Sequence, residues 1–181
     1  MDLILETNRL FLRELKVSDA DAFFAMDNNP NVHKYLWNKP VEKIEETIEI
    51  IDFVRKQYID NRIGRFAIIL KETNEFMGWA GLKYNTEVVN NKIYFYDIGY
   101  RLDERFWENG YASEATFAWL KYAFETMKIK TIEAAAHTDN IASNRILQKI
   151  GMQMTEQYID NGASWNWYEL ENNLQIFTSQ S

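Results

Sequence analysis

The chain has 181 residues, a formal net charge of −7, 46% hydrophobic residues, no cysteine and only two histidines. The acidic balance argues against nucleic acid as a partner, because surfaces that bind nucleic acid are usually basic. The absence of cysteine excludes disulfides and thiolate chemistry, and two histidines far apart in sequence argue against a zinc site, so we expect no metal. This length and composition predict a single domain, residues 1–181, with a packed core.

The first residues, MDLILETNRLFLRE, contain neither a basic region nor a sustained apolar run, so we expect no signal peptide. No stretch reaches the roughly 18 apolar residues that a membrane-spanning helix needs. We therefore expect a cytoplasmic protein that does not bind membranes. The sequence leaves open whether it forms a homodimer.

The first third of the chain predicts a strand or ribbon and then two helices. Apolar residues on both faces of residues 3–15 indicate the strand. Ser18 is the expected N-cap of a first helix, which Asn28-Asn29-Pro30 ends. Residues 32–39 form a loop or short helix. A second helix follows Pro40, where Ile44, Ile48 and Ile51 recur near helical spacing.

The remainder predicts three strands, a helix, a strand, a helix and two final strands. The expected strands are 65–71, 76–84, 92–102, 130–136, 153–158 and 164–170. The expected helices are 111–127, which is apolar almost all round and therefore buried on more than one side, and 141–150, which Asp139 or Asn140 caps. This order predicts a mixed α/β (α+β) domain around one sheet. The strands 92–102 and 130–136 should run parallel, joined by a right-handed crossover.

The segment from Trp107 to Ala112, WENGYA, lies at the junction between a strand and a helix. Small residues at 110 and 112 leave the backbone N–H groups open, and a helix N-terminus carries unpaired donors and a partial positive charge. This arrangement suits a phosphate or pyrophosphate. The alternative is an ordinary tight turn that needs a small residue.

Two motifs in order resemble the GNAT acetyltransferase superfamily, in its RimJ/RimL-like branch. The strand YDIGYRL followed by WENGYASEA is similar to the acyl-CoA pyrophosphate loop of that branch, with Trp107 at the usual Gln or Arg position and Ala112 at the second Gly. NIASNRILQKIGM is similar to its later helix, with Met152 in place of Phe. The resemblance covers roughly residues 5–169. It implies a twisted, mostly antiparallel sheet of about seven strands with about four helices on its two faces.

The resemblance also implies an acetyl-CoA-dependent N-acetyltransferase, with acetyl-CoA as co-substrate. The backbone of residues 98–102 would pair with the pantetheine arm, the amides of residues 107–112 would hold the pyrophosphate, and a strand bulge at Gly99 would open a gap for the thioester. Because they are near the loop, Arg101, Arg105 and Arg145 are candidates for phosphate contacts; the alternative is ordinary solvated charge. The implied cofactor-binding residues are Ile98, Gly99, Tyr100, Arg101, Leu102, Trp107, Glu108, Asn109, Gly110, Tyr111, Ala112, Asn140, Ser143 and Arg145.

Acetyl transfer to an amine needs a base for the amine, a donor for the oxyanion and a proton for the leaving thiolate. Asp97 is the leading candidate base; the alternative is a sheet-edge carboxylate that is solvated or paired with an arginine. The family's usual acidic tyrosine is replaced by Leu147, which leaves Ser143 or a water as the proton donor. The oxyanion donor is expected to be a backbone N–H near Gly99 or Tyr100.

The acceptor amine is the least determined feature. Aromatic and polar side chains outside the helices suit recognition, although core or dimer packing explains them equally well. The aromatic candidates are Tyr35, Trp37, Trp165 and Trp167. His137, after the expected strand 130–136, could touch the acceptor; the alternative is an ordinary capping or loop histidine. Glu14, at the end of the first strand, is a further acceptor-side candidate and a second candidate base; the alternative is a surface charge. A protein or peptide N-terminal amine is the first hypothesis. A small amine such as an antibiotic or polyamine, and a non-catalytic acyl-CoA sensor, are the alternatives.

Overall fold

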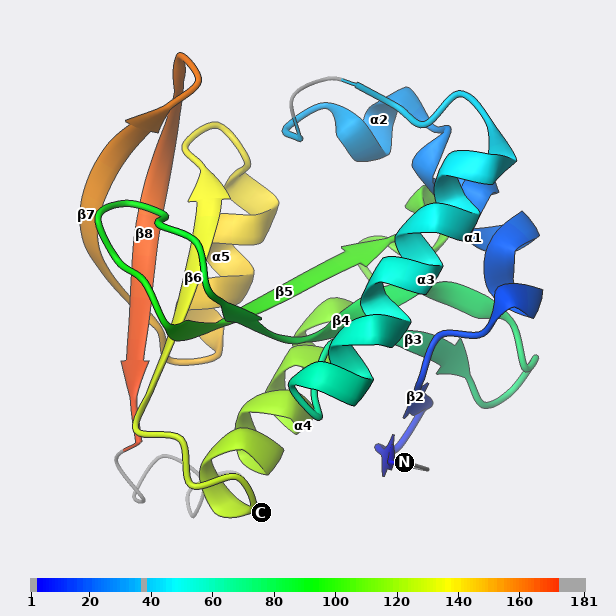
Figure 1. Cartoon of the computed structure of the whole chain (residues 1–181), viewed down its shortest axis with the longest axis horizontal. Coiled ribbons are helices and arrows are strands. Elements are labelled where there is room, and N and C mark those ends of the chain that lie inside the picture. Colours follow the sequence, from blue (N-terminus) through cyan, green and yellow to red (C-terminus); the bar gives the residue numbers. More distant parts are fainter. Residues whose placement is uncertain (1–2, 37–38, 173–181) are drawn as a thin grey trace.

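The computed structural model describes residues 3–36 and 39–172. In this part of the chain eight strands form one sheet in the order β1-β2-β3-β4-β5-β6-β8-β7 (Figure 1). The strands are β1 (Ile4–Glu6), β2 (Leu10–Arg13), β3 (Arg65–Leu70), β4 (Phe76–Asn85), β5 (Phe95–Leu102), β6 (Thr131–His137), β7 (Gln153–Asp160) and β8 (Ala163–Glu171). All neighbours are antiparallel except β5 and β6, which run parallel as predicted.

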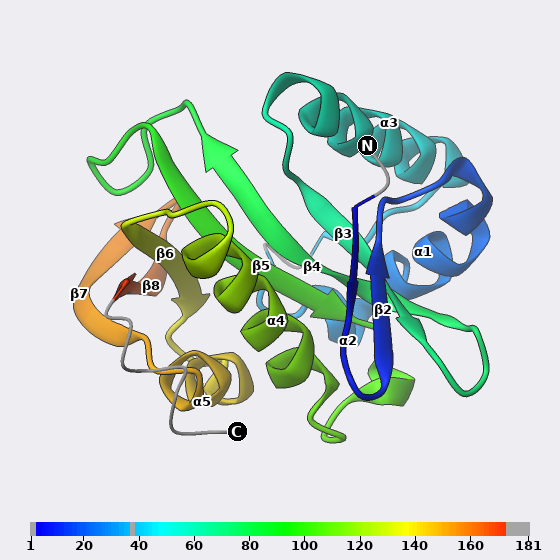
Figure 2. The same ribbon diagram turned by 90° about the horizontal axis from the view of Figure 1, so that it is seen from below.

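Helices cover both faces of the sheet, as expected from the sequence. The α-helices are α1 (Ala20–Asp27), α2 (Pro30–His33), α3 (Ile44–Asp60), α4 (Tyr111–Glu125) and α5 (Ile141–Lys149), with 3-10 turns η1 (Val17–Asp19) and η2 (Glu104–Phe106). Figure 2 shows α1 and α3 on one side of the sheet and α4 and α5 on the other. We call the side of α1 and α3 the α1/α3 face. No helix of the described ranges is sufficiently long and apolar to span a bilayer.

The hydrophobic core fills both faces of the sheet, against α1 and α3 on one side and against α4 on the other. Trp119 and Leu120 of α4 are fully buried, and the Trp119 ring meets Phe66 of β3 edge-on with centroids 4.7 Å apart. Each fully buried aromatic or aliphatic side chain of this kind contributes about 1.5–3 kcal/mol. The buried residues of α4 recur at helical spacing along one broad stripe that faces the sheet, so the predicted burial on more than one side is wrong.

Three local predictions differ from the structure. Residues 3–15 form a hairpin, β1 and β2, because the Thr7 side chain bonds to Leu10 N–H and turns the chain; this brings the strands to eight. Ser18 does not cap α1. It lies within η1, and Asp19 takes the N-cap position and accepts from the Lys16 N–H at 2.8 Å.

The strand predicted from residue 92 begins at Phe95. The preceding residues Asn90, Asn91 and Tyr94 have φ values of 48°, 59° and 60°, which interrupt extended backbone. Pro30 ends α1 and also begins α2, at a position where its missing N–H costs nothing.

Candidate active site

The segment between η2 and α4 forms a loop with backbone N–H groups that lack hydrogen-bond acceptors in the described residues. We call residues 108–112 the phosphate cradle. Glu108 and Gly110 have φ values of 62° and 79°, and Gly110 is the N-cap of α4. Within the described residues the five amides from Glu108 to Ala112 make no hydrogen bond. The sixth predicted amide, that of Trp107, donates to Glu104 O at 3.2 Å. Left-handed residues followed by a helix N-terminus concentrate N–H groups in the way that anion sites require.

Trp107 closes the base of the cradle with its side chain. The indole Nε1 donates to Leu102 O at 2.9 Å, and Asn109 Nδ2 donates to Trp107 O at 2.8 Å. These bonds join the end of β5 to the start of α4. The indole therefore has a structural contact at the position where the family usually has Gln or Arg.

The structure turns two of the predicted phosphate-binding arginine side chains toward carboxylates. Arg101 Nη1 donates to both carboxylate oxygens of Asp27 at 2.9 Å, so its guanidinium lies on the α1/α3 face against α1. Arg105 pairs with Asp103 at 2.9 Å. Arg145 is exposed on α5. Because the Arg101 side chain is held by Asp27, only its backbone in β5 is open to a pantetheine arm.

Strands β5 and β6 diverge beside the cradle. Their only registered pair is Asp97 with Glu133, so the two strands separate toward Leu102 and His137. The predicted bulge at Gly99 is wrong: β5 pairs with β4 in unbroken register, with Gly99 opposite Gly81. The gap instead follows from the loss of pairing between β5 and β6 after Asp97.

Gly99 instead leaves space for the side chain of Arg65. A Cβ added at Gly99 would lie 2.8 Å from Arg65 Nη2 and 2.9 Å from Cζ. Across the bare backbone of Gly81 and Gly99, the Arg65 guanidinium reaches Asp97, with Nη2 at 2.6 Å from Oδ1. It also donates to the main-chain oxygens of Gly81 and Asp97. The predicted base is thus held in a charged pair, with 28% of its side chain exposed.

On the other side of the sheet, Ser143 sits against the divergent strands. Its Oγ lies 2.9 Å from the hydroxyl oxygen of Tyr100, a β5 residue, and Tyr100 O–H also contacts Ser143 O at 3.2 Å. Burial raises the pKa of Tyr100 well above its usual value. Asn140 caps α5, since its Oδ1 accepts from the Ser143 N–H at 3.1 Å. Three predicted site residues are therefore brought together at the N-terminus of α5.

Three predicted acceptor residues also meet, on the α1/α3 face. The His137 ring lies 5.7 Å from that of Tyr35 and 5.6 Å from that of Trp165, centroid to centroid. Beside them Ala135 is exposed in the middle of β6, although both of its strand neighbours are buried. The aromatic trio therefore borders an uncovered stretch of sheet next to the β5–β6 gap.

The other predicted acceptor residues lie elsewhere. Trp167 is buried beneath Phe95 and Tyr158. Glu14 follows β2, with strands β3 and β4 between it and β5. Trp37 is outside the described residues.

Glu133 is a site residue that sequence reasoning missed. It pairs in register with Asp97, is only 7% exposed, and has one carboxylate oxygen without a partner in the described part of the chain. The other oxygen is 3.6 Å from Lys92 Nζ. Burial raises the pKa of Glu133, and the nearby Glu169 and Asp97 add to the effect while Lys92 opposes it. A lone charged residue in the apolar run TIEAAA was the available signal.

Comparisons with known proteins identify the class. The family model of the acetyltransferase (GNAT) domain matches residues 9–153. YoaA of Bacillus subtilis (strain 168), named as an uncharacterized N-acetyltransferase, is 35% identical over 167 residues, which cover 90% of this chain and 92% of YoaA. The chain therefore belongs to the GNAT acetyltransferase family and is an acetyl-CoA-dependent N-acetyltransferase.

Solved structures share the fold. A GNAT-family acetyltransferase from Bacillus anthracis superposes with a TM-score of 0.80 at 25% identity, covering 94% of this chain and 99% of the other. RimL, described as a ribosomal L7/L12 α-N-protein acetyltransferase in complex with coenzyme A, superposes with a TM-score of 0.78 at 22% identity. That match covers 93% of this chain and 98% of RimL. Both confirm the predicted fold.

Proposed function

We propose that the protein acetylates the N-terminal α-amine of a protein or peptide, by direct attack of the amine on acetyl-CoA in a ternary complex. The observation that carries this proposal is the uncovered sheet at Ala135, which opens beside Asp97 and is bordered by the trio of Tyr35, His137 and Trp165. An extended chain end fits such an open strip. RimL, which shares the fold, is described as an α-N-protein acetyltransferase.

The cofactor end of the proposal uses the cradle and β5. The open amides of residues 108–112 fit the diphosphate of acetyl-CoA, and Gly110, at φ 79°, keeps a side chain out of the cradle. The pantetheine arm would lie along the residues of β5 after Asp97, where β6 has separated. Asn140 and Ser143 lie at the N-terminus of α5, where Ser143 contacts Tyr100 of β5.

In the proposed reaction, the amine nitrogen bonds to the thioester carbon and the carbon–sulfur bond then breaks. Asp97 takes the proton that the amine loses. A backbone N–H near Gly99 or Tyr100 donates to the oxyanion, and Ser143 O–H, or a water, supplies the proton to the thiolate. An α-amine with a pKa near 8 needs only about 1 kcal/mol for deprotonation at pH 7, whereas a lysine near 10.4 needs about 4–5. A carboxylate base is therefore adequate for an α-amine.

The test is thiol release from acetyl-CoA with a panel of acceptors. The panel contains peptides with free N-termini, the same peptides N-acetylated but carrying lysine, polyamines and aminoglycosides. We expect turnover only with free N-termini. Turnover confined to polyamines or aminoglycosides would show that the acceptor is a small molecule and not a peptide. Thermal stabilisation by CoA without turnover on any amine would indicate an acyl-CoA sensor.

A further inference from the structure

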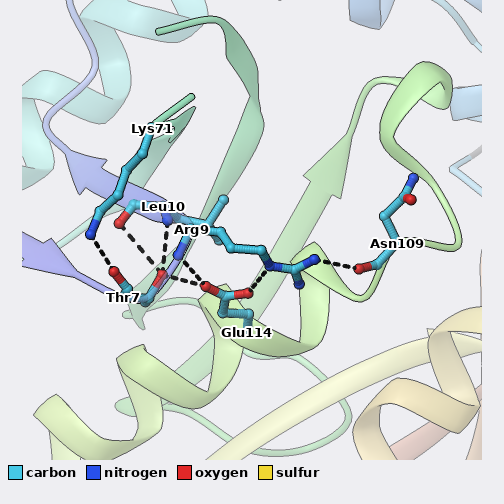
Figure 3. Close-up of polar contacts among 6 residues, drawn as sticks. All are labelled: Thr7, Arg9, Leu10, Lys71, Asn109 and Glu114. Atoms are coloured by element: carbon cyan, nitrogen blue, oxygen red, sulfur yellow. Dashed lines mark hydrogen bonds and ion pairs between the residues drawn. The ribbon is translucent and has the colours of Figure 1, made fainter. Parts of the chain in front are cut away.

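The phosphate cradle is fastened to the β1–β2 hairpin by a charged network (Figure 3). Arg9 Nε donates to Glu114 Oε2 at 2.7 Å, and Arg9 N–H donates to Glu114 Oε1 at 2.9 Å. The Thr7 hydroxyl donates to the same Oε1 at 2.6 Å. Arg9 Nη1 then donates to Asn109 O, within the cradle, at 3.1 Å. One side chain therefore joins the hairpin, the first turn of α4 and the cradle.

Glu114 alone would oppose binding of a diphosphate. Its position near the N-terminus of α4 suits the helix dipole, but it also places a negative charge beside a site for negatively charged oxygens. Burial raises the pKa of Glu114, yet the hydrogen bonds from Thr7 and Arg9 outweigh burial and lower it. Glu114 is thus charged at neutral pH, and the Arg9 guanidinium neutralises it.

The bond from Arg9 to Asn109 O also sets the direction of a cradle donor. In a trans peptide the C=O and the following N–H point in opposite directions. Anchoring Asn109 O on Arg9 therefore directs the Gly110 N–H away from Arg9. The guanidinium also lies over the Tyr111 ring, 4.3 Å from its centroid, which fixes its plane.

The second terminal nitrogen of Arg9 is uncommitted. Within the described residues Nη2 makes no hydrogen bond, and a Cβ added to Gly110 would lie 3.6 Å from it. The guanidinium thus brings positive charge to the glycine at the centre of the cradle.

We propose that Arg9 is a positioning residue for the acyl-CoA diphosphate: it orients the Asn109–Gly110 peptide and cancels the charge of Glu114. The proposal rests on the use of the cradle for acetyl-CoA in the proposed function. It does not depend on which amine is the acceptor, because CoA binding is measured without one. Absence of turnover on peptides would thus affect the proposed function and leave this inference intact.

The experiment compares Arg9→Gln with a matched control on the same hairpin. Arg13, in β2, also forms a two-bond ion pair, at 2.7 and 2.8 Å from Asp19, but it contacts η1 and not the cradle. We expect R9Q to raise the Kd for CoA and the KM for acetyl-CoA about tenfold, which corresponds to about 1.4 kcal/mol, with kcat changed less than about twofold. R13Q should lower Tm and leave the Kd for CoA unchanged.

Two further measurements separate positioning from simple tethering of the hairpin. S-acetyl-pantetheine lacks the diphosphate, so R9Q should use it as well as the wild type does. Glu114→Gln removes the negative charge and leaves Arg9 in place, so it should bind CoA at least as tightly as the wild type, even if Tm falls. The proposal is overturned if R9Q keeps the wild-type Kd for CoA, or if R9Q and E114Q weaken CoA binding alike.

Discussion

Asp97→Asn is the substitution that tests the chemistry most directly, and the structure predicts that the variant folds. Asparagine keeps the shape of the side chain and removes one charge. Arg65 retains its bonds to the main-chain oxygens of Gly81 and Asp97, so its guanidinium stays over the glycine pair. Loss of one charge-assisted hydrogen bond costs about 1.5–3 kcal/mol. For a chain of this size each kcal/mol lowers Tm by about 2–4 °C, so assays at 25 °C remain on folded protein.

The effect on turnover should be larger than the effect on binding. A positioned general base contributes about 10²–10⁴-fold, so we expect kcat at pH 7 to fall at least about 100-fold. The KM for acetyl-CoA should change little, because the cradle amides are not touched. The defect should shrink toward pH 9, since an α-amine with a pKa near 8 then loses its proton to water.

The assay is thiol release between pH 6 and pH 9.5 with a free-N-terminus peptide, for the wild type, D97N and Glu133→Gln. Glu133 is the matched control because it is the carboxylate paired in register with Asp97. Equal rates for D97N and the wild type at every pH would refute the role of Asp97 and leave it as the partner of Arg65. A pH-dependent loss of rate in E133Q but not in D97N would indicate that Glu133, and not Asp97, accepts the proton.

Further outcomes follow from single contacts. Gly110→Asp should weaken CoA binding by calorimetry at least about tenfold more than Gly110→Ala, because both bear the strain of φ 79° but only aspartate brings charge into the cradle. Tyr58→Phe should lower the free energy of unfolding in urea by about 1–3 kcal/mol, since the hydroxyl joins Leu15 N–H to Arg65 O; no loss would contradict that bridge. Burial raises the pKa of Glu133 in the folded protein above its value of about 4.3 in the unfolded chain. The protonated side chain therefore contributes its full stabilisation below the unfolded pKa, and this contribution is lost as pH rises through the folded pKa. The unfolding free energy of the wild type minus that of E133Q should therefore decrease from pH 4 upward, and a difference that is constant with pH would contradict it.

The element order and the cradle were predictable because their signals are local. Helical spacing, the N-cap at Asn140 and the strand-to-helix junction at Gly110 each lie within a few residues. The parallel pairing of β5 and β6 followed from the crossover rule. Patterns of this kind are set by backbone geometry, which acts over the length of one element.

The partners of the charged groups were not predictable, because they come from distant parts of the chain. Arg65 is 32 residues from Asp97, and Arg9 is 105 residues from Glu114. Gly99 shows the same limit: glycine in a strand indicates either a bulge or close approach of another group, and only the position of Arg65 decides between them. The same holds for Glu133, whose environment depends on Lys92 and Glu169 from other strands and loops.

The proposed diphosphate site and the proposed base are supported by separate networks. Arg9 ties the cradle to the hairpin and α4, whereas Arg65 ties Asp97 to β3 and β4 across the glycine pair. The two networks have no residue in common. Independent sites give additive free energies, so the losses in log(kcat/KM) of R9Q and D97N should sum in the double variant. A double variant no worse than D97N alone would show instead that fixing the diphosphate and orienting the base are one coupled event.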